Sequence, residues 1–281
     1  MAKKIEEPQY ILSALNTQML NYRTYVMNTQ EKITTFLLAF CAGGIVGLIF
    51  YGGQFRDSDG TATTATMVCN IVLFVTIGII ATCVFIPIRK KQLLDKRRKE
   101  LTQEFRSFLE ALAVSLASGM NMADSLSSAY NDLKIEYSDT AYMVLEVKEM
   151  IDGIQNNIAI EDMMISLGER SQIDDIKNFG MVFSVAYRAG GNLKDIVRRT
   201  NSIIGEKIEI AEEIETTLSS NKSQFSAMMF IPVVMILLLR VMSSSFAASF
   251  ATVAGVIAMT IAIGIFIIAY RLGQKIMDVK G

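Results

Sequence analysis

The chain has 281 residues, of which 51% are hydrophobic, with a mean hydropathy of +0.36 and a formal net charge of −1. It contains no histidine, the most common general base and metal ligand in proteins. It also lacks the phosphate-binding loop pattern of nucleotide hydrolases. We therefore expect no cofactor, no metal site and no enzymatic activity that depends on a histidine-activated nucleophile.

Four apolar stretches are long enough to cross a bilayer, whose core of roughly 30 Å requires a helix of about 20 apolar residues. They form two pairs, at about 34–53 and 66–88 and at about 227–244 and 250–270. The sequence therefore predicts an all-α integral membrane protein with four transmembrane helices. The expected parts are an N-terminal segment (1–33), the first pair (34–88), a polar block (89–226), the second pair (227–270) and a tail (271–281).

The N-terminal segment carries apolar residues at helical spacing. The stripe consists of Ile11, Leu15, Met19, Tyr22 and Val26. It predicts a cytoplasmic amphipathic helix that lies on the membrane or against the rest of the protein. A helix that docks a dedicated partner is the alternative interpretation.

Three features inside the apolar windows bear on packing. Gly43, Gly44 and Gly47 are small enough to let a second transmembrane helix approach the first window closely. Pro232 opens the third window and frees a backbone carbonyl. Arg240 lies toward the outer end of the same window. A buried arginine there would mark a functional site, but we favour a side chain that extends its charge to the membrane surface.

Lysine and arginine residues flank the windows on one side only. They precede the first window and follow the second and the fourth, whereas the short loops at 54–65 and 245–249 contain only Arg56. Positive flanks mark the cytoplasmic side of a membrane protein. We therefore expect the N-terminus, the C-terminus and the polar block to be cytoplasmic.

The polar block begins with a strongly basic run. Residues 89–99 hold seven Lys and Arg against one Asp, whereas residues 100–226 hold 11 Lys and Arg against 21 Asp and Glu. The basic run suits the anionic surface of the inner leaflet, although a signal that fixes the membrane topology explains it equally well. The acidic remainder argues against a nucleic-acid partner, which requires a basic surface.

Apolar residues of the block recur at helical spacing, and the block contains no proline. Short connections between such helices are typical of an antiparallel bundle. We expect the first and last helices to continue into the second and third spans, and Ser138 to cap the third helix. About six helices are predicted, at about 91–118, 121–132, 139–155, 160–169, 174–189 and from 192 onward.

Two turns of the block have similar sequences. In each, glycine ends one helix, asparagine caps the next, and aspartate stands three residues after the asparagine. The residues are Gly119, Asn121 and Asp124 in the first turn, and Gly190, Gly191, Asn192, Leu193 and Asp195 in the second. This echo suggests two similar helix hairpins, although short matches of this kind also arise by chance.

The stretch from Phe105 to Pro232 resembles the F domain of bacterial type II secretion systems. The resembling elements are Phe108-Leu-Glu-Ala-Leu-Ala, then Gly119, and later Arg188-Ala-Gly-Gly-Asn-Leu193, followed by a long helix. Type IV pilus and archaellum platform proteins carry related domains. A single copy between two pairs of spans looks like the Tad (tight adherence) platform subunits TadB and TadC.

The resemblance implies a scaffold in the bacterial inner membrane rather than an enzyme. Such proteins dock a cytoplasmic hexameric secretion ATPase and pass its motion to pilin subunits that leave the bilayer. With one F domain per chain, a second F-domain subunit or a homo-oligomer would supply the other. Candidate interaction or hinge residues are Gly119, Asn121, Asp124, Arg188, Gly190, Gly191, Asn192, Leu193 and Pro232.

A multi-pass transporter or channel subunit with a large cytoplasmic regulatory domain is the alternative hypothesis. Transport through the membrane favours polar or charged residues along the spans. The four windows carry almost none, apart from Arg240. The glycines of the two turns are likewise open to two interpretations, because helix termination explains them as well as a hinge does.

Overall fold

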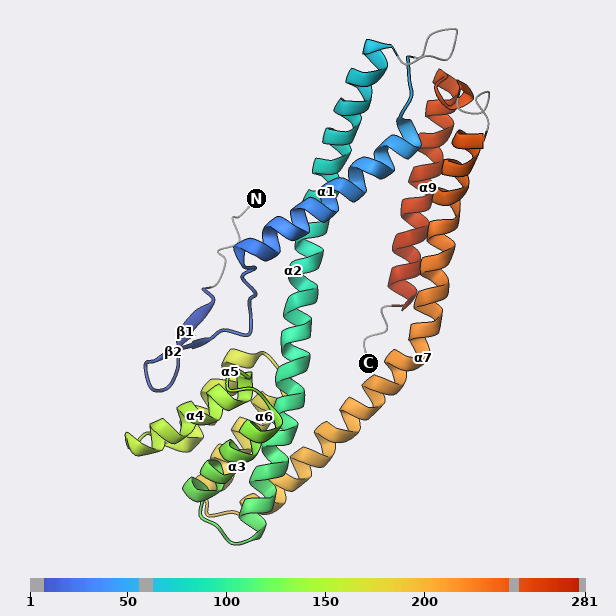
Figure 1. The fold of residues 1–281 in the computed structure, drawn as a ribbon. Helices are drawn as coiled ribbons and strands as arrows, with labels where there is room; N and C mark the ends of the chain where they lie inside the picture. The colour runs from blue at the N-terminus through green and yellow to red at the C-terminus, as the bar shows by residue number, and fades with distance from the viewer. Residues whose placement is uncertain (1–7, 56–62, 243–247, 278–281) are drawn as a thin grey trace. The chain divides into compact units, whose positions relative to one another are not determined.

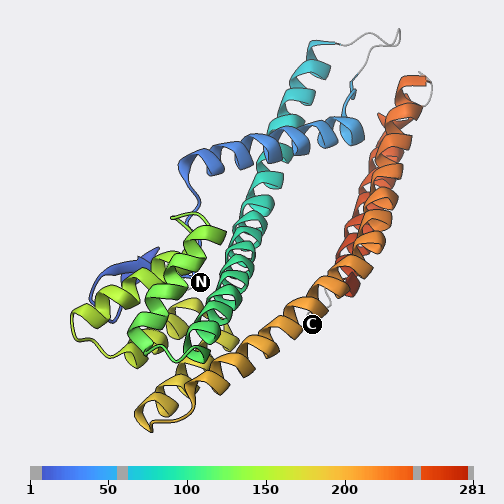
Figure 2. The ribbon, with the colours of Figure 1, turned by 60° about the horizontal axis from the view of Figure 1, so that its bottom comes forward.

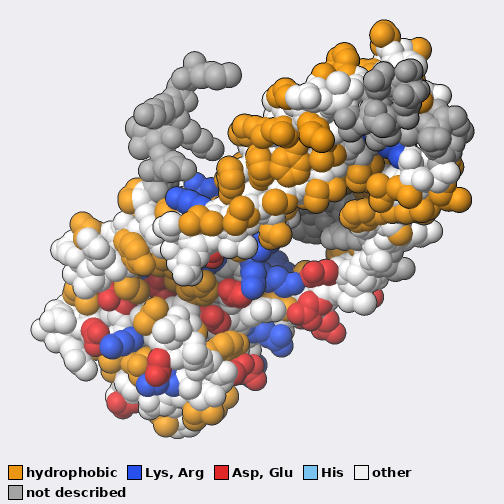
Figure 3. Space-filling view, turned by 45° about the horizontal axis from the view of Figure 1, so that its top comes forward, with side chains coloured by type: hydrophobic (Ala, Val, Ile, Leu, Met, Phe, Trp, Pro, Cys, Tyr) orange, Lys and Arg blue, Asp and Glu red, His pale blue; other side chains and the backbone are white. Residues whose placement is uncertain are grey.

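A computed structural model of the chain describes residues 8–55, 63–242 and 248–277. The chain divides into two compact units. One, the block unit, combines Met1–Val26 with Lys90–Ile210. The other, the membrane unit, combines Met27–Arg89 with Ala211–Gly281. Figure 3 shows hydrophobic side chains covering the visible face of the spanning helices, whereas charged side chains are concentrated on the block.

Four described helices are long and apolar enough to cross a membrane. They are α1 (Thr29–Tyr51), α2 (Thr64–Ala117), α7 (Leu193–Met242) and α9 (Val253–Met277). The first begins with a capping box, in which the side chains of Asn28 and Glu31 each accept a backbone hydrogen bond from the other end of the turn. This cap places the start of α1 five residues before the apolar window.

Glycines let α1 approach α2 closely, as the sequence predicts. A methyl group at Gly43 would lie 2.4 Å from the side chain of Ala81, and one at Gly44 would lie 2.4 Å from the ring of Phe74. That ring also packs edge-on against Phe40 of α1, with 5.4 Å between the centroids. Close backbone approach of this kind favours helix association in lipid, where hydrophobic attraction between helices is weak.

The helices α2 and α7 run without interruption from the apolar windows into the block (Figure 1). They contain 54 and 50 residues, or about 80 Å and 75 Å at 1.5 Å per residue. Pro87 and Pro232 lie within these helices and end neither of them. The predicted continuity of the outer block helices with the second and third spans is therefore present.

Between these two helices come α3 (Met122–Glu136), α4 (Tyr142–Gln155), α5 (Ile160–Ser171) and α6 (Asp174–Arg188). They lie beside the C-terminal part of α2 and share one apolar core with it and with the start of α7 (Figures 1 and 2). Its largest buried side chains include Phe105, Phe108, Phe183, Leu112, Leu126 and Met164.

Two glycines bring α5 and α6 together. A methyl group at Gly168 of α5 would lie 2.8 Å from the Cα atom of Lys177 in α6. In return, a methyl group at Gly180 of α6 would lie 2.8 Å from the carbonyl oxygen of Met164 in α5. The reciprocal contact leaves no room for a side chain at either position, so this helix pair depends on both glycines.

The N-terminal segment is not the helix that its apolar stripe predicts. It forms an antiparallel hairpin of β1 (Tyr10–Leu12) and β2 (Gln18–Leu20), with Tyr10 opposite Leu20. The turn residues explain the difference: the Ser13 amide donates to the Thr17 carbonyl, and Asn16 adopts a left-handed conformation with φ of 59°. Such local hydrogen bonds compete with helix formation. We call residues 8–26 the N-terminal strap.

Helix α4 receives its N-terminal cap from another helix. Its own N-cap residue, Ala141, makes no side-chain hydrogen bond, and Ser138 lies outside the first turn, so the expected Ser138 cap is wrong. The carboxylate of Glu104 in α2 instead accepts a 2.7 Å hydrogen bond from the Met143 amide. A side chain from α2 thus accepts a hydrogen bond from the first turn of α4, where no neighbouring side chain provides a cap.

This arrangement makes the stability of the block depend on pH. Burial raises the pKa of the Glu104 carboxyl above its ordinary value of 4.5. The folded protein therefore holds this proton more tightly than the unfolded chain, and the free energy of unfolding falls as pH rises through the raised pKa. Glu104→Gln keeps an acceptor for the Met143 amide but cannot titrate. We expect its stability relative to wild type to improve as pH rises from about 4 to 7.

Thermal unfolding of the purified proteins at several pH values measures this difference. Glu110→Gln is the matched control, because Glu110 lies on the same helix and is exposed. Unfolding midpoints of wild type and Glu104→Gln that shift in parallel over the whole range would contradict the assignment.

Candidate functional site

The turn between α2 and α3 is a fully hydrogen-bonded corner. Gly119 adopts a φ of +88°, its amide donates to the Leu116 carbonyl, and the Met120 amide donates to the Ser115 carbonyl. These two bonds complete a Schellman motif at the end of α2. Two residues after the glycine, the Asn121 side chain accepts from the Asp124 amide at 2.9 Å and donates to its carboxylate at 2.7 Å.

The turn between α6 and α7 repeats this geometry. Gly190 has a φ of +66° and donates to the Tyr187 carbonyl, while Gly191 donates to the Ala186 carbonyl. Asn192 then donates to the Asp195 carboxylate at 2.5 Å and accepts from its amide at 3.4 Å. Leu193 is the first residue of α7 and packs against the core. The similarity noticed in the sequence is therefore a shared corner geometry.

Both corners lie at the same end of the block (Figures 1 and 2), where α2 ends and α7 begins. Each corner combines a Schellman motif at the end of one helix with an asparagine N-cap at the start of the next. The backbone amides in these two motifs therefore already have hydrogen-bond acceptors. Helix termination, the simpler interpretation of the glycines, accounts for every bond in both corners. A hinge at either glycine would require these bonds to break.

Arg188 joins the second corner to a neighbouring helix. Its guanidinium group contacts Glu161 at 3.2 Å and Asp162 at 3.1 Å, both in the first turn of α5. The structure thus brings Arg188 together with the second corner. Pro232 stands apart, because it lies in the membrane unit within the apolar part of α7.

The corners, helices α3 to α6 and the start of the third span fall within one stretch that matches a protein-family model. Residues 108–239 match the family model of type II secretion system (T2SS), protein F. The matched stretch begins in α2, includes α3 to α6 and ends in the apolar part of α7, so it extends further into the span than the predicted block. Comparisons with curated proteins and with solved structures find no match.

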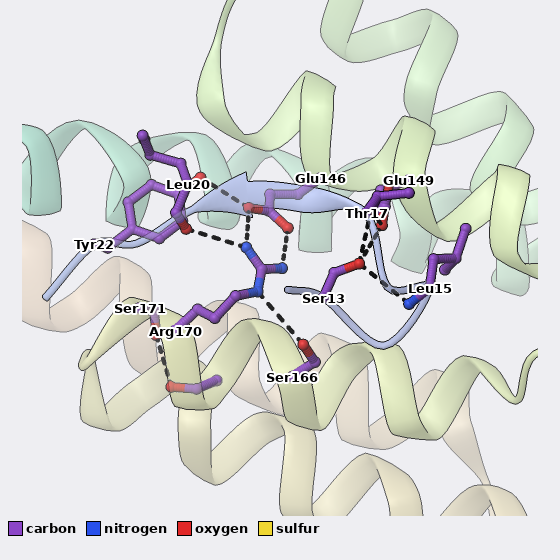
Figure 4. Close-up of polar contacts among 11 residues, drawn as sticks. Ser13, Leu15, Thr17, Leu20, Tyr22, Glu146, Glu149, Ser166, Arg170 and Ser171 are labelled. Atoms are coloured by element: carbon purple, nitrogen blue, oxygen red, sulfur yellow. Dashed lines mark hydrogen bonds and ion pairs between the residues drawn. The ribbon is translucent and has the colours of Figure 1, made fainter. Parts of the chain in front are cut away.

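A buried ion pair within the matched stretch has no local signal in the sequence. Glu146 of α4 and Arg170 of α5 are 1% and 4% exposed, and both nitrogens of the Arg170 fork contact the two oxygens of Glu146 (Figure 4). The Tyr22 hydroxyl of the strap donates to the same carboxylate at 2.9 Å. Burial, followed by the nearby Glu146 charge, raises the pKa of Tyr22 well above its ordinary value.

Further hydrogen bonds fasten the strap to the same two helices. The Ser13 and Thr17 hydroxyls donate to the Glu149 carboxylate of α4 (Figure 4). Arg23 donates to the Glu169 carbonyl of α5 at 2.9 Å. The Tyr22 amide donates to the Arg170 carbonyl, so the backbone and the side chain of Tyr22 are both held. The strap is therefore a fixed part of the block unit.

Removing one member of the buried pair should be severely destabilising. Arg170→Ala leaves the Glu146 carboxylate buried without its partner, and we expect a loss of about 3–5 kcal/mol in the free energy of unfolding. The double variant Glu146→Leu with Arg170→Met should lose less, because it buries no isolated charge. Thermal and chemical unfolding of the detergent-purified protein measures both.

The exposed pair of Lys134 and Asp139 provides the control, with 40% and 76% of the side chains exposed. Lys134→Ala should leave the unfolding midpoint unchanged, because exposed ion pairs contribute little. If Arg170→Ala were no more disruptive than Lys134→Ala, the buried pair would not hold the strap in place.

The Arg240 side chain is held by the end of α1. Its guanidinium group donates to the carbonyl oxygens of Gly52 at 2.7 Å and Phe50 at 2.8 Å, at the end of α1. Its Cζ atom also lies 5.3 Å from the centre of the Phe250 ring. A cation that binds the last carbonyls of a helix satisfies groups which would otherwise have no partner in lipid. Arg240 thus connects α7 to α1.

Arg240→Lys tests this connection. Lysine keeps the charge but cannot reach two carbonyls with one planar fork. We expect a lower thermal unfolding midpoint in detergent, corresponding to roughly 1–3 kcal/mol for the lost hydrogen bonds. Substitution of lysine for Arg271, in the last part of α9, is the control and should have no such effect. Equal midpoints for Arg240→Lys and wild type would rule out a capping role.

Proposed function

We propose that this chain is an inner-membrane platform protein of a Tad-type (type IVb) pilus assembly or a type II secretion-like machine. In this role it couples a cytoplasmic secretion ATPase to the extraction and assembly of pilin subunits. The observation that carries the proposal is the F-domain match over residues 108–239, combined with four helices able to span a membrane.

The two long helices support a mechanical role. Because α2 and α7 continue from the apolar windows into the block, a force on the block acts directly on two spanning helices. No loop at the membrane surface absorbs the movement along either helix. A packed helix transmits strain because protein interiors are dense and compress little.

The corner end of the block is the ATPase-docking surface in this proposal. Exposed apolar side chains accompany both corners: Val114 and Met120 are 65% and 46% exposed, and Val182 and Val185 are 52% and 71% exposed. Exposed apolar groups of this kind mark protein interaction sites when they gather. The acidic character of residues 100–226 would steer a basic face of the ATPase toward them.

The remaining partners follow from the same proposal. A single F domain calls for a second F-domain subunit, TadB-like or TadC-like, or for a homo-oligomer. The basic flanks of the windows favour cytoplasmic N- and C-termini in the bacterial inner membrane. The corner residues Gly119 and Gly190 then act by shaping the docking surface, since their caps are complete.

Co-purification from detergent with the secretion ATPase tests the proposal. We expect Val185→Glu and Met120→Glu each to reduce recovery of the ATPase at least tenfold, because a buried unpaired charge disrupts an apolar contact. The control is Ile135→Glu, which alters an apolar side chain that is 86% exposed at the opposite end of α3. This variant should behave as wild type.

Pilus assembly or protein secretion in cells that carry each variant provides the second measurement. The corner variants should fail to support it, although their unfolding midpoints match that of wild type. Retention of the ATPase by both corner variants would rule out the docking surface. Normal assembly and secretion after deletion of the whole gene would rule out the platform role itself.

A further inference from the structure

A cavity of about 550 Å³ lies between the N-terminal strap and helix α4. Its lining includes Tyr10 and Tyr22 of the strap, Thr140 and Tyr142 at the start of α4, and Arg97 of α2. All of these residues belong to the block unit. The strap residues and Arg97 lie outside residues 108–239, which the family model matches. Thr140 and Tyr142 lie within them.

Among the described residues, Arg97 is a buried cation without an anionic partner. The residue is 8% exposed, and the one hydrogen bond that it makes to this part of the chain is a long one of 3.4 Å from Nη1 to the Thr24 carbonyl. Its Nε atom is buried without any hydrogen bond. Among the described residues, no carboxylate lies within 4.0 Å of its guanidinium group. Buried charges in proteins are normally paired, so this one calls for a ligand.

Aromatic faces hold the guanidinium group in place. Its Cζ atom lies 4.3 Å from the centre of the Tyr25 ring and 5.9 Å from that of Tyr142. Stacking of this kind stabilises the cation but uses none of its N–H groups. The planar fork of donors is therefore oriented by its neighbours, and among the described residues the long Nη1 contact is the one hydrogen bond that it makes.

The carboxylates of the cavity wall are already engaged. Glu146 is bound by Arg170 and by the Tyr22 hydroxyl, and Glu149 is bound by the strap hydroxyls. Asp152 and Lys148 also line the cavity and carry opposite charges. Arg97 is thus the buried cation on this wall that has no carboxylate within 4.0 Å among the described residues, whereas the Glu149 charge is hydrogen-bonded by neutral hydroxyls.

The surrounding sequence identifies the class of ligand. Arg97 lies about 12 Å further along α2 than Arg89, which directly follows the second apolar window. It belongs to the basic run of residues 89–99, which attracts anionic headgroups. An arginine fork recognises phosphate oxygens in a bidentate manner.

We propose that this cavity binds a phosphate group, with Arg97 as its main ligand-binding residue. The phosphate belongs either to the headgroup of an anionic lipid or to a soluble phosphoester. Its oxygens accept hydrogen bonds from the free Arg97 N–H groups and take the place of a carboxylate partner. This site is independent of the platform role, so either proposal can fail without the other.

Binding to the full-length protein in detergent tests the site. Phosphatidylglycerol is titrated into the protein, a glucosyl diacylglycerol with the same acyl chains serves as the phosphate-free lipid, and glycerol 3-phosphate serves as the soluble phosphoester. The readouts are the thermal unfolding midpoint, which rises when a ligand binds only the folded state, and the number of bound lipids in native mass spectrometry.

The key comparison is between neighbouring arginines. Arg97→Gln should weaken phosphate-dependent stabilisation roughly tenfold to a hundredfold, the effect of losing one charge-assisted contact. Arg98→Gln is the matched control: it removes the same charge from the next position and also a hydrogen bond to the strap, from Arg98 Nε to the Tyr22 carbonyl at 3.1 Å. This control should bind as wild type does.

A second variant keeps Arg97 itself. Thr140 is exposed at the rim of the cavity, and Thr140→Glu adds a carboxylate that competes with the phosphate for the guanidinium group. We expect it to abolish the stabilisation without lowering the midpoint of the free protein. It keeps the proposal testable if Arg97→Gln folds poorly.

Each outcome has a defined meaning. Stabilisation by phosphatidylglycerol alone supports the site and identifies a lipid headgroup, whereas equal stabilisation by glycerol 3-phosphate supports the site and identifies a soluble phosphoester. Equal losses in the Arg97 and Arg98 variants would overturn the proposal, because they would indicate attraction by net charge alone. Stabilisation by the glucosyl lipid as strong as that by phosphatidylglycerol would overturn it as well.

Discussion

The block unit can bury the Glu146 carboxylate because the guanidinium group of Arg170 neutralises its charge. Arg170 supplies the opposite charge and Tyr22 supplies a hydroxyl, so α4, α5 and the N-terminal strap meet at one carboxylate. An isolated charge in this position would be very costly, and an apolar pair would be about as stable. The pair therefore adds specificity more than stability, since it selects the one arrangement in which strap and helices satisfy each other.

The same principle operates elsewhere in the chain. Glu104 supplies the cap that α4 lacks, and Arg240 supplies the donors that the end of α1 lacks. In each case a helix end is completed by a side chain from a distant part of the sequence. Arg97 is the exception: its aromatic neighbours hold it, but the described residues offer it no anion. This contrast is what makes a ligand the natural explanation for that cavity.

Features that rest on local signals could be predicted from the sequence. The apolar windows, the continuity of α2 and α7 and the Gly–Asn corners each depend on residues within a few turns of one another. Contacts between distant residues could not be predicted. Arg170 and Glu146 look like ordinary surface residues of two helices, and nothing near Arg240 in the sequence indicates the carbonyls of α1. The apolar spacing of the strap predicts a helix, but the turn at Ser13 and Asn16 reverses the chain and produces a hairpin.

The strap gives the chain one connection between its units that does not run through a long helix. The chain passes between the two units three times, at Val26–Met27, Arg89–Lys90 and Ile210–Ala211. The last two crossings lie inside α2 and α7, whereas the first directly follows the strap. Because Glu146 and Arg170 help to hold the strap on the block, loss of this ion pair would release the first crossing while both long helices stay intact.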